Sequence, residues 1–167
     1  GVTTPTSAEL NLSWVGTVPS AVLTSTAWEF VDGEDLSKTV SSQNYALMFT
    51  RNASDGKMIL SMNSKSFYIQ AKNGNLKAGS NIVAKLTKDP SWSGAGLTGV
   101  VAGRKFDIKL NGTTLTKSDS TIATIPSSGT NKHQQIIVTA DGELPKGTYI
   151  EGKDVSISAT IMFAADV

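Results

Sequence analysis

The segment KDVSISATIMFAADV, residues 153–167, alternates apolar and polar side chains along its whole length. Successive side chains of a β-strand point to opposite faces, so this period of two predicts a strand with one buried face. Its 15 residues would span roughly 46 Å, more than the width of about 40 Å expected for a compact domain of this size. We therefore predict a central strand with more than one neighbour. Its apolar row is Val155, Ile157, Ala159, Ile161, Phe163, Ala165 and Val167.

A second alternating run stands at the N-terminus, where apolar or β-branched residues occupy the even positions. Pro5 has no N–H to donate to a ladder, which confines this part to a sheet edge or to a strand added from outside. If the run extended to Val18, it would span more than about 50 Å. We predict that it overhangs the domain or folds back at Pro5. Its row is Val2, Thr4, Thr6, Ala8, Leu10, Leu12 and Trp14.

The middle of the chain repeats short alternating runs separated by turn dipeptides, without a sustained period of 3.6 residues. This pattern predicts an all-β fold, a β-sandwich, with a barrel as the alternative. Residues 33–38 are expected to form one helical turn. The predicted strands are 21–30, 45–51, 57–62, 66–71, 81–87, 105–110, 113–117, 121–125 and 133–140. Turns are predicted at Asp32, Asp55, Asn73, Asn111 and Asp141, each followed by Gly, with Asn111-Gly112 as the clearest hairpin.

Length and composition favour one domain of an extracellular type. The 167 residues suffice for one core, and 15 Lys plus Arg nearly balance 14 Asp plus Glu without a basic run, so nucleic acid is not an expected partner. Cysteine is absent, and charged residues make up 17% of the chain against about 25% in a typical domain. No stretch approaches 18 apolar residues, and no signal-like segment follows Gly1, so we expect a soluble, mature chain.

Three motifs suggest chemistry but have a simpler interpretation. Residues 94–99, GAGLTG, match a dinucleotide fingerprint but lack the strand before and the helix after it, so we predict a glycine loop. His133 is the only histidine, and we expect it at an exposed strand start. The acidic residues between Glu29 and Asp35 favour a solvated turn over a calcium loop. We therefore predict no catalytic residue, no cofactor and no metal.

The three tryptophans separate two further hypotheses. Trp14 and Trp28 share parity with apolar neighbours and are expected in the core. Trp92 lies in a loop rich in Pro and Gly and is the best candidate for an exposed aromatic contact. An exposed Trp92 would fit a carbohydrate-binding module, which is one alternative function. A viral or phage fibre domain is another, and an enzyme is the least favoured.

Four short segments together carry a resemblance to a known family. They are LSWVGTVP at 12–19, WEFVDG at 28–33, LPKGTY at 144–149 and TIMFAADV at 160–167. With them the chain resembles chaperone–usher fimbrial subunits, and more narrowly the cysteine-free colonisation-factor pilins of enteric bacteria.

The resemblance implies an immunoglobulin-like β-sandwich that lacks its last strand and is completed by a donor strand from a neighbouring subunit. Residues 1–12 would be the donor-strand extension and residues 13–167 the pilin domain. The donor residues would be Val2, Thr4, Thr6, Ala8, Leu10 and Leu12, and the acceptor groove would contain Val155, Ile157, Ala159, Ile161 and Phe163.

The resemblance also implies partners and a location. The chain would be a structural subunit, the major pilin, of an adhesive fimbria on the bacterial surface, exported through the periplasm. Its partners would be other copies of itself, a periplasmic chaperone and an outer-membrane usher during assembly, and further a tip adhesin and a host-cell receptor.

Overall fold

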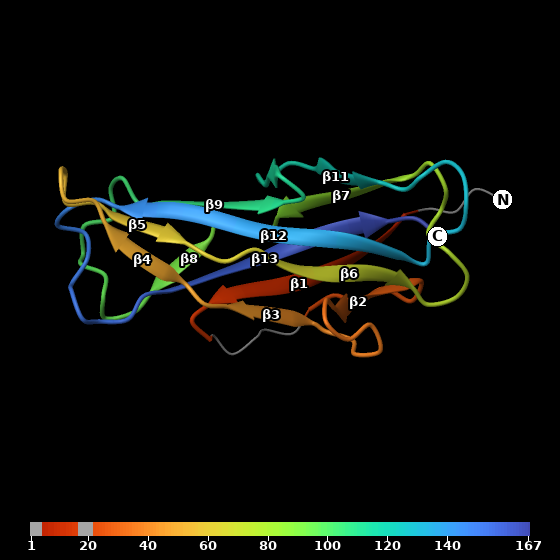
Figure 1. Cartoon of the computed structure of the whole chain (residues 1–167), viewed down its shortest axis with the longest axis horizontal. Coiled ribbons are helices and arrows are strands. Elements are labelled where there is room, and N and C mark those ends of the chain that lie inside the picture. The colour runs from red at the N-terminus through yellow and green to blue at the C-terminus, as the bar shows by residue number, and fades with distance from the viewer. Residues whose placement is uncertain (1–4, 17–21) are drawn as a thin grey trace.

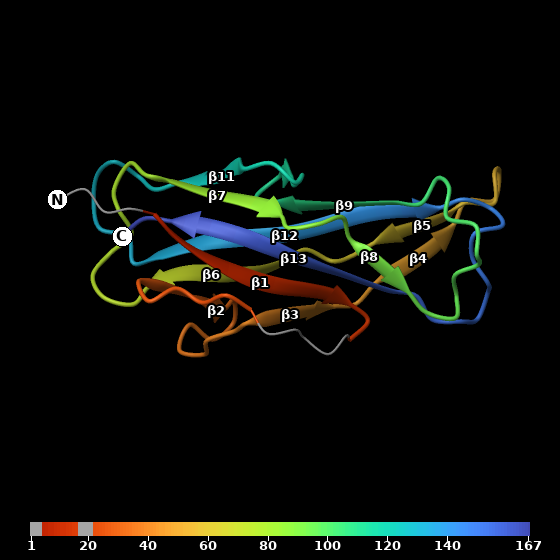
Figure 2. The same ribbon diagram turned by 180° about the vertical axis from the view of Figure 1, so that it is seen from behind.

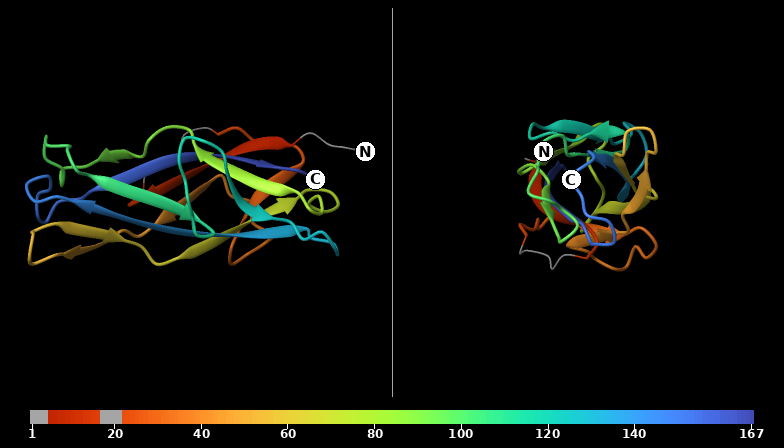
Figure 3. Two further views of the ribbon diagram at one scale, coloured as in Figure 1. Left: turned by 90° about the horizontal axis from the view of Figure 1, so that it is seen from above. Right: turned by 90° about the vertical axis from the view of Figure 1, so that its left-hand side faces the viewer.

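The computed structural model describes residues 5–16 and 22–167, and within these residues every regular element is a β-strand. The strands form two facing sheets in an elongated sandwich (Figures 1 and 3). This agrees with the predicted all-β, immunoglobulin-like sandwich rather than with a barrel. One sheet has the order β11-β7-β13-β1-β3, with β8 also paired to β13. The other has the order β10-β9-β12-β5-β4, with β6 paired to β12 and β2 to β6.

The bounds of the strands follow the predicted runs closely in the second half of the chain. The first sheet consists of β1 (Thr6–Trp14), β3 (Ser42–Tyr45), β7 (Asn81–Leu86), β8 (Ser91–Ser93), β11 (Ser120–Thr124) and β13 (Ser156–Ala165). The second sheet consists of β2 (Trp28–Asp32), β4 (Met48–Arg51), β5 (Met58–Ser61), β6 (Lys65–Ala71), β9 (Lys105–Leu110), β10 (Thr113–Thr114) and β12 (His133–Leu144).

Strand β13 is central, as predicted. It has β1 on one side and β7 and β8 on the other, all antiparallel. It begins at Ser156, three residues later than expected, because Lys153 and Asp154 belong to the preceding loop. Its inward row and Val155 before it are buried, whereas Val167 after it is half-buried.

Four local predictions in the chain are wrong. The run 45–51 is divided between β3 and β4, which lie in different sheets. Of the run 21–30, only the part from Trp28 onward is a strand among the described residues. Asp141-Gly142 lies inside β12 rather than in a turn. Residues 33–38 form no helix, because the Asp35 carboxylate holds a tight turn by accepting hydrogen bonds from the N–H and hydroxyl of Ser37.

The predicted hairpin at Asn111-Gly112 is confirmed. Both residues have positive φ, 48° and 80°, as a two-residue turn of this hand requires, and the turn joins β9 to β10. Gly142 has a different role, since a Cβ there would lie 2.2 Å from the carbonyl oxygen of Lys105 on β9. Gly142 is therefore glycine because β12 and β9 pack closely at this point, and not because the chain turns there.

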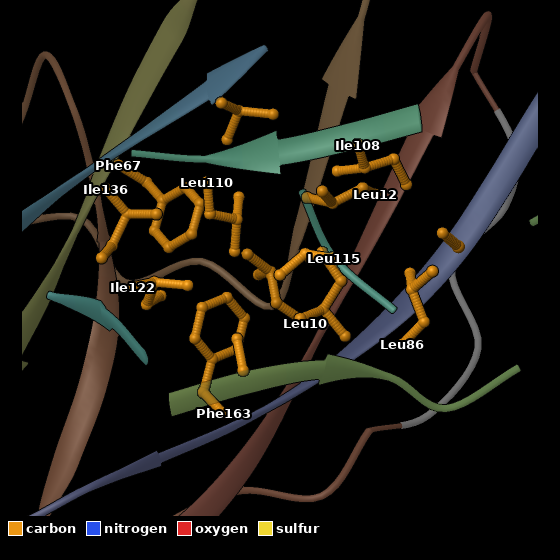
Figure 4. Close-up of a cluster of buried hydrophobic side chains, with 14 of the residues drawn as sticks. Leu10, Leu12, Phe67, Leu86, Ile108, Leu110, Leu115, Ile122, Ile136 and Phe163 are labelled. Carbon is orange, nitrogen blue, oxygen red and sulfur yellow. The ribbon is translucent and has the colours of Figure 1, made fainter. Parts of the chain in front are cut away.

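The core lies between the sheets and draws on both ends of the chain (Figure 4). Leu10 and Leu12 of β1 point to the same interior as Phe67 of β6 and Phe163 of β13. The ring of Phe163 lies 5.0 Å from that of Phe30 and 6.0 Å from that of Phe67, both in edge-to-face geometry. Such aromatic pairs add to the stabilisation from apolar burial.

Candidate functional site

The candidate site is the position that β1 occupies beside β13. The two strands run antiparallel in an unbroken register from Thr6 opposite Ala165 to Trp14 opposite Ile157. On its other side, β1 pairs in parallel with β3, from Asn11 beside Ser42 to Trp14 beside Tyr45. Figure 2 shows β1 lying against β13. The segment that the sequence singled out as strand-forming is therefore an interior strand of the first sheet.

The alternation of β1 sets which side chains enter the core. The even-numbered side chains are buried, with an exposed fraction of 3% at Ala8 and 0% at Leu10, Leu12 and Trp14. Thr6 is half-buried, and Val2 and Thr4 lie outside the described residues. The structure thus brings the described donor candidates together with the acceptor candidates. Phe163 lies opposite Ala8, Ile161 opposite Leu10, Ala159 opposite Leu12 and Ile157 opposite Trp14, with Val155 just beyond them.

One expectation about this site needs correction. The C-terminal strand was expected to lack a partner in its own chain, but β1 of the same chain fills that place. The physical reason lies directly after Trp14, where Val15 and Gly16 have φ of 70° and 49° and turn the backbone out of the strand. By Leu23 the chain is again beside β1, where the N–H of Glu9 donates to the Leu23 carbonyl at 3.0 Å. The N-terminal segment therefore folds back onto its own domain.

The start of β1 is held by polar contacts from the first residue of β2 and from the segment before it. The indole N–H of Trp28 donates to the Thr6 carbonyl at 3.2 Å, and the hydroxyls of Thr6 and Ser25 are 2.8 Å apart. The Leu23 N–H donates to the Glu9 carboxylate at 3.0 Å. Trp28 is fully buried, so its N–H needs a partner in the protein. These contacts make β1 a specific partner for this position.

The end of β1 is anchored by Trp14, which the sequence placed in the core but not in the site. Its ring lies 4.7 Å from that of Phe106 and 5.4 Å from that of Tyr45, and its indole N–H is 3.3 Å from the Met62 sulfur. Burial raises the pKa of the Tyr45 hydroxyl well above its usual value. The even parity that Trp14 shares with Leu12 was the signal that could have identified it as a site residue.

The outer face of β1 carries polar side chains that also match their neighbours. The Thr160 hydroxyl donates to the Asn11 side-chain oxygen at 2.7 Å, at a point where the two residues are directly opposite. The Ser13 hydroxyl donates to the side-chain oxygen of Asn44 on β3. Sequence reasoning treated only the apolar row, so it missed these contacts. They fix the register, because a shift by one residue would separate both pairs.

The motifs that suggested other chemistry have structural roles. Gly94 and Gly96 lie against the chain before β13, and the Gly96 N–H donates to the Asp154 carbonyl at 2.8 Å. Trp92, predicted to be an exposed contact, is half-buried on β8, where its ring lies 6.1 Å from that of Phe106. His133 begins β12 as predicted but is half-buried rather than exposed, and its Nε2 lies 2.6 Å from the Gln70 side-chain oxygen.

Neither a metal centre nor a membrane helix is evident in the part of the chain that the structure describes. Within residues 5–16 and 22–167, His, Asp and Glu side chains nowhere gather in a group of three or more that could hold a metal ion. Among the same residues there is also no helix long and apolar enough to cross a membrane.

Comparison with known proteins finds a distant relative of this chain. The CS5 fimbrial subunit of Escherichia coli is 22% identical over 181 residues, an alignment that covers 97% of this chain and 88% of the relative. No protein-family model matches the chain. The chain is thus distantly similar, along almost its whole length, to a fimbrial subunit whose name describes a component of a surface filament.

Proposed function

We propose that this chain is a structural subunit, the major pilin, of an adhesive chaperone–usher fimbria, and that it polymerises by giving β1 to a neighbouring copy. The observation that carries the proposal is the fit of β1 to β13. Every residue from Thr6 to Trp14 has a partner on β13, and the even side chains fill the core. Because every copy contains the same strand and the same position beside β13, the contacts made within one chain can also form between two chains.

In this proposal, residues 1–12 are the donor-strand extension and residues 13–167 the pilin domain. Strand β1 crosses that boundary and ends at Trp14, so Ser13 and Trp14 would accompany the extension into the neighbour. An exchanged polymer would keep the described buried contacts of β1 and would lose the reversal at Val15 and Gly16. The two forms would therefore share most of the apolar burial that β1 contributes.

Assembly in this way requires protection of the acceptor position before exchange. An open edge beside β13 would expose backbone groups and an apolar row, which promotes aggregation. We infer that a periplasmic chaperone covers this edge and that an outer-membrane usher releases the subunit into the growing fimbria. The assembled filament would stand outside the cell and support attachment to host cells, with a tip adhesin and a host-cell receptor as further partners. The similarity to a fimbrial subunit supports this setting.

A disulfide trap tests the exchange directly, because the chain has no cysteine of its own. Asn11 and Thr160 lie directly opposite on β1 and β13, and the Cα distance of about 4.5–5.5 Å between opposite residues suits a disulfide. The variant Asn11→Cys with Thr160→Cys is made in cells that assemble the native material, which is then oxidised and boiled in detergent without reductant.

Exchange between copies predicts a ladder of covalent multimers that collapses to the monomer when reductant is added. The single variant Asn11→Cys is the matched control and should give at most a dimer. A disulfide found only within the monomer would show that β1 stays in its own chain, and the proposed polymerisation would be wrong.

A further inference from the structure

A cavity of about 220 Å³ lies at the end of the sandwich toward which β1 runs. It lies between the second sheet, at the start of β4 and β5 and the end of β12, and the loop before β13. Its wall is mainly apolar, and two of its side chains are unusually exposed for their type, Phe49 at 42% and Ile150 at 47%. Apolar cavities of about 150 Å³ are large enough to hold a benzene molecule. The other apolar residues of the wall are Met58, Leu144, Tyr149 and Val155.

The register of β1 with β13 points to this cavity. Each step forward on β1 is one step back on β13, and the last pair is Trp14 with Ile157. If an incoming strand continued straight in the same register, its Gly16 would lie opposite Val155 and its Val18 opposite Lys153. Both Val155 and Lys153 line the cavity.

The strand on the other side of β1 also ends near this cavity. These strands are parallel, so each step forward on β1 is a step forward on β3, and the last pair is Trp14 with Tyr45. After Tyr45 the chain crosses to the other sheet and begins β4, where Phe49 lines the cavity together with Lys153 of the loop before β13.

The alternation of the strand then decides which side chain enters. Val18 has the same parity as Leu10, Leu12 and Trp14, whose side chains all point into the core. Gly16 has this parity too but brings no side chain. Val18 is therefore the first apolar side chain after Trp14 that a straight strand would place in the cavity.

The folded-back chain does not follow this line. Val15 and Gly16 turn the backbone out of the strand before the level of the cavity, and at Leu23 the chain is beside Glu9 again. In an exchanged polymer the donor's chain must instead continue past this end of the acceptor to reach its own domain.

We propose that the cavity is a docking site for a second copy of this chain and receives Val18 of the donor subunit. This rests on the proposed exchange of β1 and extends the contact between the two copies beyond Trp14. The contact would stabilise the polymer, because Val18 of the donor would cover apolar surface on Phe49 and Ile150.

The test again uses the cysteine-free chain. Val18→Cys is combined with Lys153→Cys in the full-length protein, and the control combines Thr17→Cys with Lys153→Cys, since Thr17 has the opposite parity. Oxidised native assemblies are boiled without reductant. We expect covalent multimers with Val18→Cys and a clear loss of them with Thr17→Cys.

The trap between Asn11 and Thr160 separates the two ways to fail. If that trap gives a ladder but the Val18 pair does not, or gives only a disulfide within the monomer, the docking site is wrong and the exchange stands. If neither pair gives a ladder, the exchange itself fails, and the docking site fails with it.

A second measurement avoids engineered cysteines. Phe49→Ala should lower the temperature at which the polymer dissociates in detergent, whereas Ile59→Ala should leave that temperature unchanged. Ile59 is the matched control, because it is similarly exposed, at 38%, in the paired strand but does not line the cavity. Val18→Ser should lower the dissociation temperature in the native background and cause no further loss in the Phe49→Ala background. Equal effects of Phe49→Ala and Ile59→Ala would overturn the docking site.

Discussion

Trp14 and Ile157 form the last antiparallel pair between β1 and β13, and both side chains are fully buried. Directly after Trp14, the backbone of Val15 leaves the strand with φ of 70°. The point where β1 ends is therefore both a tightly packed anchor and a reversal of the chain. Two consecutive residues thus have different roles, since Trp14 holds the strand in place and Val15 turns the backbone out of it.

The parity of β1 should be visible in polymer formation. Leu10→Asp places a carboxylate in the core opposite Ile161, where it has no partner, so we expect the heat-labile polymer ladder to be lost. Asn11→Asp keeps the oxygen that accepts the Thr160 hydroxyl and should retain most of the ladder. Unboiled detergent gels compare the two variants. Equal loss at both positions would contradict the alternation.

The reversal at Val15 should cost stability in the monomer. A β-branched residue with positive φ is strained by about 1–3 kcal/mol, and glycine removes that strain at a cost of about 0.4–1 kcal/mol in chain entropy. We expect Val15→Gly to raise the free energy of unfolding by about 1 kcal/mol, or Tm by about 2–4 °C. Thermal unfolding of the monomer measures this. Gly16→Ala, at φ of 49°, should lower Tm, and a lower Tm for Val15→Gly would contradict the assignment of strain.

Substitutions in the GAGLTG segment, residues 94–99, should affect stability through packing. A Cβ at Gly94 would lie 2.3 Å from the Asp154 carbonyl oxygen, whereas one at Gly99 would meet nothing within 4 Å. We therefore expect Gly94→Ala to destabilise the chain by about 1–3 kcal/mol and Gly99→Ala to change little. Thermal unfolding compares the two, and similar melting temperatures would show that the contact with the loop before β13 is unimportant.

One ion pair should give the stability a pH dependence. The Lys57 ammonium, 2.9 Å from the Glu143 carboxylate, donates a hydrogen bond that lowers the pKa of Glu143. A carboxyl with a lowered pKa in the folded state contributes stability above its unfolded pKa of about 4.3 and loses it as the pH falls through the folded value. Glu143→Gln should therefore flatten the loss of stability on acidification below about pH 5.

Chemical unfolding at several pH values measures this effect, and the partner supplies the control. Lys57→Gln should remove most of the same pH dependence, and Glu143→Gln should then add little. If the effects of the two substitutions simply added, the ion pair between Lys57 and Glu143 would not be the cause of the pH dependence.

The alternation of apolar and polar residues was enough to predict which face of a strand is buried. The alternation from Ala8 to Trp14 and from Val155 to Phe163 predicted which side chains are buried, because the two-residue period of a strand is a property of neighbouring residues. The hairpin at Asn111-Gly112 was equally predictable, since a two-residue turn with positive φ favours those residue types.

Only the tertiary structure decided which strands meet. Residues 45–51 read as one strand, but its two halves lie in different sheets, and Asp141-Gly142 reads as a turn although Gly142 packs against the backbone of β9. Above all, the alternation of β1 predicted a strand with one buried face but did not tell whether its partner strand lies in the same chain or in another. Two positive φ values at Val15 and Gly16 put it in its own chain here. The pairing of distant strands depends on where the chain reverses, and the side-chain period carries no information about that choice.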